Sequence, residues 1–221
     1  MRILVSGLVL LAAGAMSLAA QNSEEHMPVT LGFKVGIPVT DMFSAGNTTM
    51  FGGSNVLPGS NYASAVPRYE FGVSSEFHLP YHLRFEVDGL FKRGGFGSND
   101  GFSYETTKFN AWEIPGLFKY NIAMGHFRPF IDFGASFRHI STIGQTTWAP
   151  GYAFPVMADN STALHNRNSF GGVAGFGFTF KKGPFELTPE ARYTRWANES
   201  FQTNGLRTNL DQGDVLLGIA F

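Results

Sequence analysis

A histidine and a serine lie two residues apart at His139 and Ser141, a spacing that could support nucleophilic catalysis. A catalytic serine needs a histidine to take its proton and an acidic group to orient that histidine. The first acidic residue after this pair is Asp159, and Thr142 directly follows the serine. We therefore interpret His139 and Ser141 as polar loop residues, and we predict no catalytic residue and no enzymatic activity.

Two further histidines, His78 and His82, flank Pro80 and carry side chains that can bind a metal. We interpret both as residues at the rim of the fold, and we predict no metal and no cofactor. Cysteine is absent from the chain. This argues against a disulfide framework and against lipid attachment through a cysteine.

The charged residues alternate with apolar ones, which indicates strands with two different faces. In 83–92, for example, Leu83, Phe85 and Val87 alternate with charged residues. No Asp, Glu, Lys or Arg occurs on the apolar faces. Pro115 and Pro189 lie inside predicted strands, where each removes a ladder donor, and we predict β-bulges there. The alternation recurs in eight segments: 29–39, 68–79, 83–92, 112–122, 128–138, 170–180, 185–194 and 214–221.

The composition is unusual for a soluble domain. Charged residues make up 15% of the chain, against about 25% in an average soluble protein. The net charge of −1 gives no indication of nucleic-acid binding. No apolar run of 18 or more residues follows the N-terminal one, which excludes a helical membrane protein. A soluble all-β protein and a transmembrane barrel remain.

The first residues have the pattern of a secretory signal peptide. Arg2 precedes an apolar stretch, and small residues follow at Ala19 and Ala20. The alternative is an uncleaved membrane anchor, since the stretch is about as long as a spanning helix requires. We predict a signal peptide over 1–20, a short periplasmic segment over 21–28 and a barrel over 29–221.

The lengths of the connections distinguish a barrel from a sandwich. Three connections are short and lie near Pro80, at 123–126 and at 181–184, whereas four are long and polar: 40–66, 93–107, 141–168 and 197–212. Strict alternation of long and short connections is typical of outer-membrane barrels. The sequence therefore predicts an all-β fold, an eight-stranded antiparallel up-and-down transmembrane β-barrel with four long outer loops and three short periplasmic turns.

Four short motifs occur in order along these strands: EIPGLFKY at 113–120, RPF at 128–130, PEARY at 189–193 and VLLGIAF at 215–221. With the alternating strands, they resemble the small outer-membrane β-barrel families, among them the OmpA-type transmembrane domain and the opacity-protein-like porin relatives. The resemblance implies a bacterial outer-membrane location, delivery by periplasmic chaperones and insertion by the barrel-assembly machinery, with Phe221 as the assembly signal. No peptidoglycan-binding domain follows, so cell-wall anchoring is not implied.

An eight-stranded barrel has an interior just wide enough for side chains to fill. Buried charges must pair, because each unpaired ion costs several kcal/mol in desolvation. We predict that the inward charges fill the lumen as a paired network. It comprises Lys34, Glu70, Arg84, Glu86, Asp88, Lys92, Glu113, Lys119, Arg128, Asp132, Arg138, Glu190, Arg192 and Asp214, and Glu76 faces inward with them.

The long loops carry apolar residues that either contact a partner or pack on each other above the barrel: Met42, Phe43, Met50, Phe51, Trp148, Tyr152, Phe154 and Met157. We predict an integral outer-membrane protein with a structural and surface-recognition, adhesin-like role. A narrow porin is the alternative. A lipid-modifying barrel enzyme is less favoured, although His139 and Ser141 resemble the His-x-Ser of lipid A deacylases. The expected partners are outer-membrane lipid and lipopolysaccharide, with no nucleic acid, and the protein is expected to be a monomer.

Overall fold

The computed structural model describes residues 29–45, 61–64, 68–99, 103–122, 127–151, 153–202 and 206–221. No helix among these residues is long and apolar enough to cross a membrane. The predicted signal peptide and the segment 21–28 lie outside the described residues. Eight strands form the main body: β1 (Val29–Pro38), β4 (Tyr69–His78), β5 (Leu83–Asn99), β6 (Tyr104–Asn121), β7 (Phe127–Trp148), β9 (Asn168–Lys182), β10 (Phe185–Trp196) and β12 (Asp211–Ala220).

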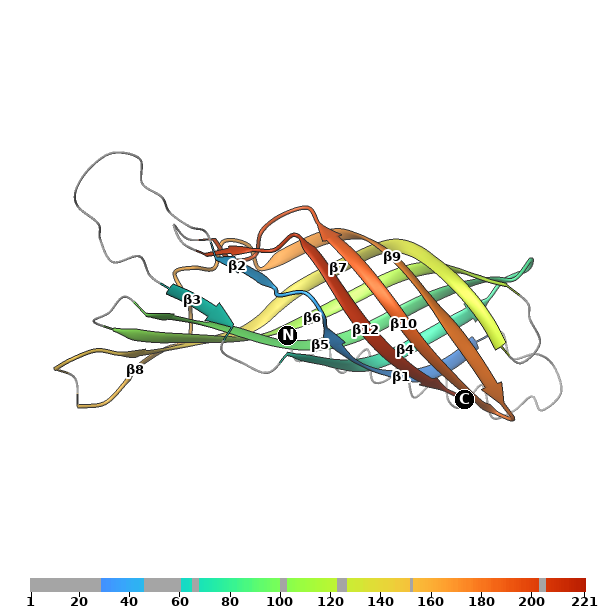
Figure 1. Ribbon diagram of the computed structural model, residues 1–221, viewed down its shortest axis with the longest axis horizontal. Coiled ribbons are helices and arrows are strands. Elements are labelled where there is room, and N and C mark those ends of the chain that lie inside the picture. Colours follow the sequence, from blue (N-terminus) through green and yellow to red (C-terminus); the bar gives the residue numbers. More distant parts are fainter. Residues whose placement is uncertain are drawn as a thin grey trace.

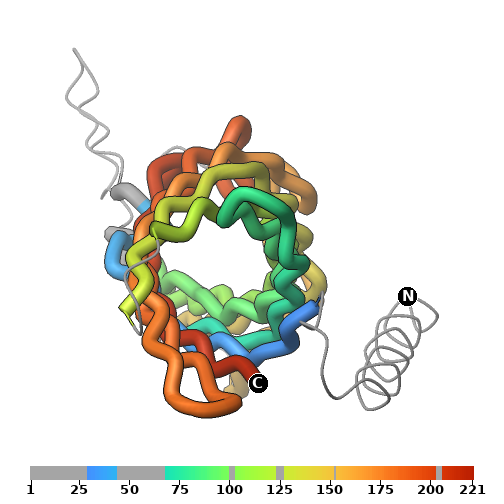
Figure 2. Tube along the Cα trace, turned by 90° about the vertical axis from the view of Figure 1, so that its right-hand side faces the viewer, coloured from blue at the N-terminus to red at the C-terminus, as the bar shows by residue number. Residues whose placement is uncertain are grey.

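The eight strands form a closed antiparallel barrel. Each pairs with the next one along the chain, and β1 also pairs with β12. The β1–β12 ladder runs from Gly32–Ala220 to Pro38–Asp214. Figure 2 shows the strands as a ring seen from one end. Closure leaves no open edge in the wall. The predicted eight-stranded up-and-down barrel is confirmed.

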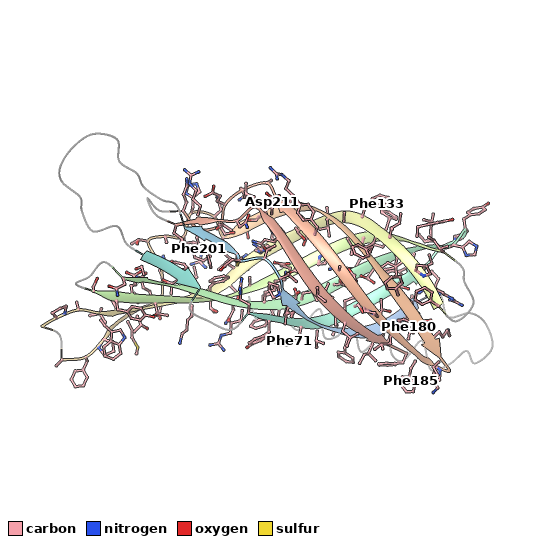
Figure 3. All side chains as sticks on the ribbon, viewed as in Figure 1. Phe71, Phe133, Phe180, Phe185, Phe201 and Asp211 are labelled. Atoms are coloured by element: carbon pink, nitrogen blue, oxygen red, sulfur yellow. The ribbon has the colours of Figure 1, made fainter. Side chains whose placement is uncertain are left out.

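The outer surface of the barrel is apolar. Phe33, Ile131 and Phe133 are between 55% and 61% exposed, and Figure 3 shows Phe133 and Phe185 on the outside of the wall. A soluble protein would bury such residues, because exposing them to water costs roughly 25 cal/mol per Å². A surrounding hydrocarbon layer removes that cost. The shortest wall strands have 10 residues, enough for a tilted strand to cross a bilayer.

The short connections lie at the end of the barrel that also holds Val29 and Phe221, which we name the turn end. Between β4 and β5, Leu79 N–H donates to the Leu83 carbonyl at 2.9 Å. Tyr81 and His82 there have φ angles of 63° and 64°. Two successive residues with positive φ match the twist of a tight hairpin. The connection 123–126 lies outside the described residues.

Three strands extend well past the rest of the barrel at the opposite end, which we name the loop end (Figure 1). β5, β6 and β7 have 17, 18 and 22 residues. Much of the predicted loops 93–107 and 141–168 is therefore strand, and β7 continues to Trp148. The period-two pattern disappears there because strands beyond the hydrocarbon layer need no apolar face, although their backbone ladder continues.

Short strands complete the loop end. β3 (Asn61–Ser64) pairs with β5, and β8 (Val156–Ala158) pairs with β7. With the extensions of β5, β6 and β7, they form a sheet that projects from the barrel, which we name the arm. β2 (Phe43–Ala45) and β11 (Leu206–Thr208) form a separate two-stranded ribbon.

The predicted bulges at Pro115 and Pro189 are wrong. The β5–β6 ladder pairs Val87 with Gly116 and Leu90 with Glu113, so its register is unchanged across Pro115. The β9–β10 register is likewise unchanged across Pro189. A proline removes one donor from the ladder without adding a residue. The register shift lies instead between β6 and β7, at Asn110/Ala111.

One glycine allows two strands of the wall to approach closely. A β-carbon on Gly134 would lie 1.9 Å from the carbonyl oxygen of Gly116 on the paired strand. Backbone cannot move aside as a flexible side chain can. Any side chain at position 134 must therefore shift β6 against β7.

We expect Gly134→Ala to lower the free energy of unfolding by about 1–3 kcal/mol, the usual cost of overpacking. Urea unfolding of the barrel in lipid vesicles, followed by tryptophan fluorescence, measures this loss. Gly172→Ala is the matched control, because a β-carbon there meets nothing within 4 Å. Equal stability of the two variants would contradict the close approach.

Candidate functional site: the lumen and its cap

Inward side chains of all eight strands converge in the lumen. Of the 14 charged residues of the predicted network, 13 are at most 8% exposed. Their inward orientation follows from alternation, because the apolar neighbours of each face outward. The exception is Arg128, which is half-buried near the turn end of β7.

A central cluster of charges crosses the middle of the lumen. Lys34 Nζ lies 2.5 Å from Glu86, 3.2 Å from Asp88 and 2.9 Å from Glu190. Arg192 lies 2.6 Å from Glu190 and 3.0 Å from Asp88. Arg192 and Glu190 lie on the same strand, but the other four pairs connect β1, β5 and β10, which are not neighbours in the wall.

Lys119 on β6 joins the same cluster from another side. Its Nζ lies 2.5 Å from Glu86 Oε2 and 3.1 Å from Glu76 Oε2, and 4.3 Å from the centroid of the Phe130 ring. Glu86 thus contacts three cations, since Arg192 also lies 3.4 Å from it. We name Lys34, Glu86, Asp88, Lys119, Glu190 and Arg192 the central cluster.

Asp132 is buried beside the central cluster but differs from its members. Neither of its carboxylate oxygens has a hydrogen-bond partner among the described residues. A β-carbon on Gly175 would come within 2.6 Å of this carboxylate. The glycine on β9 therefore provides the space that Asp132 occupies.

The network continues to the turn end through Glu76, which was predicted to face inward, and Glu186, which was not predicted. Arg84 pairs with Glu76 and lies 3.5 Å from Glu186. Glu186 is also 3.2 Å from the exposed Lys181. Glu186 also alternates with outward apolar neighbours, and this parity was the signal that could have added it to the predicted network.

A second, outer cluster lies nearer the loop end. Lys92 Nζ lies 2.9 Å from Glu70, 3.0 Å from Glu113 and 2.9 Å from Asp214. The contact between Lys92 and Glu70 is an ion pair without a hydrogen bond, since neither Glu70 oxygen accepts a hydrogen bond from the described residues. One lysine thus holds carboxylates from β4, β6 and β12 together.

Arg138 completes the outer cluster. It lies 2.6 Å from Glu113 and donates to the Gln212 side-chain oxygen at 2.5 Å. Its guanidinium lies 3.9 Å from the Trp196 ring centroid, and Trp196 Nε1 donates to the same Gln212 oxygen. Trp196 and Gln212 were not predicted. Trp196 is the last residue of β10 and Gln212 the second residue of β12. The sequence pattern assigned 197–212, which follows Trp196 and includes Gln212, to a loop.

An aromatic cap lies above the outer cluster at the loop end. The Phe201 ring is fully buried and lies 5.7, 5.6 and 4.9 Å from those of Phe43, Phe96 and Phe109. Figure 3 places Phe201 at the loop end of the barrel. We name the buried apolar cluster the cap: Phe43, Phe96, Phe109, Ala111, Ile140, Ile143, Ala163, Phe201 and Leu206.

The cavity between the outer cluster and the cap is small. It has a volume of about 30 Å³ and is lined by Phe43, Lys92, Phe109 and Arg138 among others. This is room for about two water molecules. The described part of the lumen thus holds a charged layer, a water-sized space and an apolar layer in sequence.

The apolar loop residues divide into two groups. Phe43 belongs to the cap and Met42 packs against it, as expected for loops that pack on each other. Trp148, Phe154 and Met157 are 54%, 80% and 77% exposed on the arm, as expected for residues available to a partner. Met50, Phe51 and Tyr152 lie outside the described residues.

The candidate residues His139, Ser141 and His78 contact polar groups other than those that a catalytic or metal site requires. The Ser141 hydroxyl donates to the Asn110 carbonyl at 3.2 Å, and His139 Nδ1 lies 2.7 Å from Asn168 Oδ1. His78 Nε2 lies 3.1 Å from the Thr30 hydroxyl. Within the described residues, no group of three or more His, Asp or Glu side chains could hold a metal ion.

Comparison with solved structures finds small bacterial barrels. Neisserial surface protein A is 12% identical over 89% of this chain and 98% of its own, with a TM-score of 0.45. The N-terminal β-barrel domain of Pseudomonas aeruginosa OprF is 10% identical over 89% and 100%, with a TM-score of 0.38. Yersinia pestis Ail, solved with the heparin analogue sucrose octasulfate, is 10% identical over 88% and 98%, with a TM-score of 0.38. Comparison with curated proteins finds no match.

Comparison with protein families gives a match over nearly the whole sequence. Residues 8–220 match the outer membrane protein β-barrel domain. The matched range includes all eight wall strands, their apolar outer surface and the charged lumen. The chain therefore belongs to the family of outer membrane proteins with this β-barrel domain.

Proposed function

We propose that the barrel is a non-conducting membrane anchor with its lumen plugged by paired charges. The central cluster carries this proposal, because Lys34 on β1 and Arg192 on β10 reach carboxylates of the non-adjacent strand β5 at distances of 2.5–3.4 Å. An ion that crosses would have to displace these pairs, and breaking a buried pair costs about 3–5 kcal/mol. The cap adds an apolar layer, which opposes ions because an ion would lose its water among aromatic rings.

Planar-bilayer recording of the folded protein tests the plug. We expect no steady single-channel conductance, because both layers must open before an ion can pass. The heat-dependent shift in gel mobility confirms folding in the same sample. Steady conductance steps from folded protein would contradict the plug.

One observation favours a narrow cation pathway as the second candidate. Buried carboxylates exceed their cations near the central cluster, where Lys34, Lys119 and Arg192 face Glu86, Asp88 and Glu190, with the unpaired Asp132 beside them. Excess negative charge attracts cations into a narrow passage. A conductance that selects cations and falls on Asp132→Asn would support this candidate over the plug.

The arm supports a role in surface recognition. In an outer-membrane barrel the long connections face the cell exterior, so the arm projects outward. Its distal part exposes Trp148, Phe154, Val156 and Met157. Exposed apolar residues grouped on a projecting element are typical of interaction sites. We infer an adhesin-like contact made by this part of the arm.

Adhesion of cells that display the protein tests the arm. Binding to plates coated with an extracellular-matrix extract is compared between the natural chain and a Phe154→Ser, Met157→Ser variant. We expect the variant to bind less. The control is Tyr81→Ser at the turn end, where the side chain is 87% exposed. Phe133→Ser is unsuitable as a control because it changes the lipid-facing wall. Equal adhesion of all three chains would contradict recognition by the arm.

We propose that Phe221 is recognised by the barrel-assembly machinery. Phe221 is 56% exposed and follows the outward residues Val215, Leu217 and Ile219. Its ring centroid lies 6.4 Å from that of Phe33 on β1. A terminal aromatic in this row is available to the assembly machinery before the barrel closes. We expect deletion of Phe221 to lower the amount of folded protein in the outer membrane.

A further inference from the structure

Two cations lie on the outward face of β5 and β6, where the barrel wall meets the arm. Arg93 and Lys108 are both exposed. In the β5–β6 ladder Arg93 pairs with Asn110, and Lys108 is two residues further toward the loop end, opposite Gly95. Side chains two residues apart on one strand share a face, so both cations project from the same side of the sheet.

No acidic residue faces these cations across the sheet. Tyr69 and Asn110 pair with Arg93, and Gly95 and Gly144 pair with Lys108. Among the described residues, neither cation forms an ion pair. The glycines beside Lys108 also leave its ammonium group uncovered. The positive charge of this pair therefore remains available to an external anion.

Another outward arginine at the loop end shows the contrast. Arg195 on β10 lies 2.6 Å from Asp211, which also accepts a hydrogen bond from the Tyr193 hydroxyl at 2.5 Å. Figure 3 shows Asp211 at the loop end of the wall. The charge of Arg195 is thus neutralised within the protein, whereas no described residue neutralises that of Arg93 or Lys108.

A continuous aromatic strip begins beside Arg93 at Tyr69 and continues on its turn-end side. Ring centroids of Tyr69 and Phe71 are 6.2 Å apart, those of Phe71 and Phe91 5.3 Å, and those of Phe91 and Trp112 5.4 Å. Aromatic belts of membrane proteins lie at the level of the lipid headgroups. Cations placed just beyond such a belt therefore meet the phosphate groups of the outer leaflet.

We propose that Arg93 and Lys108 bind the phosphate of a lipid in the outer leaflet, while its acyl chains pack on the strip of Tyr69, Phe71, Phe91 and Trp112. The guanidinium can hold two phosphate oxygens and the lysine adds a point charge. The site is specific for a phosphorylated lipid because the cations alone cannot hold the acyl chains and the strip alone cannot hold a phosphate. It would attach one lipid at the base of the arm.

Native mass spectrometry of the folded protein in detergent tests the site by titration with lipid A, a bisphosphorylated glucosamine lipid, and with its dephosphorylated form. We expect the phosphorylated lipid to bind about tenfold more tightly or better, as hydrogen bonds to charged groups predict. Arg93→Gln with Lys108→Gln should remove this preference. Arg195→Gln, the matched control, should keep it.

Three results would overturn the proposal. They are equal affinity of the natural chain for both lipids, an equal loss of preference in Arg195→Gln, and binding of inorganic pyrophosphate as tightly as lipid A in the absence of lipid. The last result would assign the cations to a soluble anion. The single variants Arg93→Gln and Lys108→Gln are titrated in parallel, so that a folding defect in the double variant does not prevent the comparison. The heat-dependent gel shift verifies folding of each.

Discussion

Replacing Glu86 by glutamine is expected to lower the free energy of unfolding by about 3–5 kcal/mol, the cost of breaking a buried ion pair. Glu86 is 2% exposed and lies within 3.4 Å of Lys34, Lys119 and Arg192. Glutamine keeps the size of the side chain, so the loss reports charge and not a cavity. Urea unfolding of the protein in lipid vesicles, followed by tryptophan fluorescence, measures it.

Two controls make the Glu86 result specific. Asp211→Asn breaks the exposed pair with Arg195, and exposed pairs contribute little to stability, so this variant should unfold almost as the natural chain does. Lys119→Gln added to Glu86→Gln should cost less than the two single losses combined, because the second change removes a cation that has already lost one of its two carboxylates. Equal losses in Glu86→Gln and Asp211→Asn would contradict a structural role for the central cluster.

Replacing Phe201 by alanine is expected to open the cap without opening the lumen. The ring is fully buried among Phe43, Phe96 and Phe109, and removing a buried phenylalanine costs about 3–5 kcal/mol. The cap joins the connections that carry Phe43 and Phe201 to the loop-end parts of β5, β6 and β7. We expect this loss to appear as local opening at the loop end. Hydrogen exchange should become faster for the amides of residues 201 and 208, whose hydrogen bonds join the two sides of that connection.

The wall should remain unchanged in the same experiment. The ladders on the turn-end side of the cap, around the charged clusters, do not depend on it, so their amides should exchange at the natural rate. Trp148→Ala is the control, because this aromatic is 54% exposed and its removal leaves no cavity in the cap. Bilayer recording of Phe201→Ala should still show no steady conductance, since the charged clusters lie beneath the cap. Conductance in this variant would show that the cap alone closes the lumen.

The two layers of the lumen resist ions by different means. The clusters oppose passage because pairs such as Lys34–Glu86 must be separated, and the cap opposes it because an ion would lose its water among aromatic rings. The aromatic strip beside Arg93 has no part in either layer. It faces the membrane, so the expected lipid site and the plug can be tested in separate variants.

The sequence determined the strands of the wall and the side that each residue faces. The reason is the fixed period of two along a strand, which in a lipid-embedded barrel is read directly as apolar outside and polar inside. Lys34, Glu86, Lys92 and Arg138 are all buried in the lumen, as their parity predicted. Phe133 and Phe185 face outward for the same reason.

The sequence failed where this constraint ends. Beyond the hydrocarbon layer no face needs to be apolar, so the extensions of β5, β6 and β7 were assigned to loops. Proline lacks the N–H donor of the ladder whether it lies in a continuous strand or in a bulge. The sequence at Pro115 and Pro189 therefore did not show that both strands are continuous. Nor did the loops show that Phe43 is buried while Phe154 is exposed, because both are aromatic residues in polar segments.

Only the tertiary structure decided the partners. Lys34 meets Glu86 and Glu190 across the lumen because strand tilt and closure set the height at which each inward residue lies, and no local pattern contains that information. Phe201 meets Phe43 and Phe96 because two connections and the extended strand β5 meet over one opening. The sequence determined which residues enter the lumen, since that depends on one strand at a time. The structure decided which charges pair and what covers them, since that depends on all eight strands together.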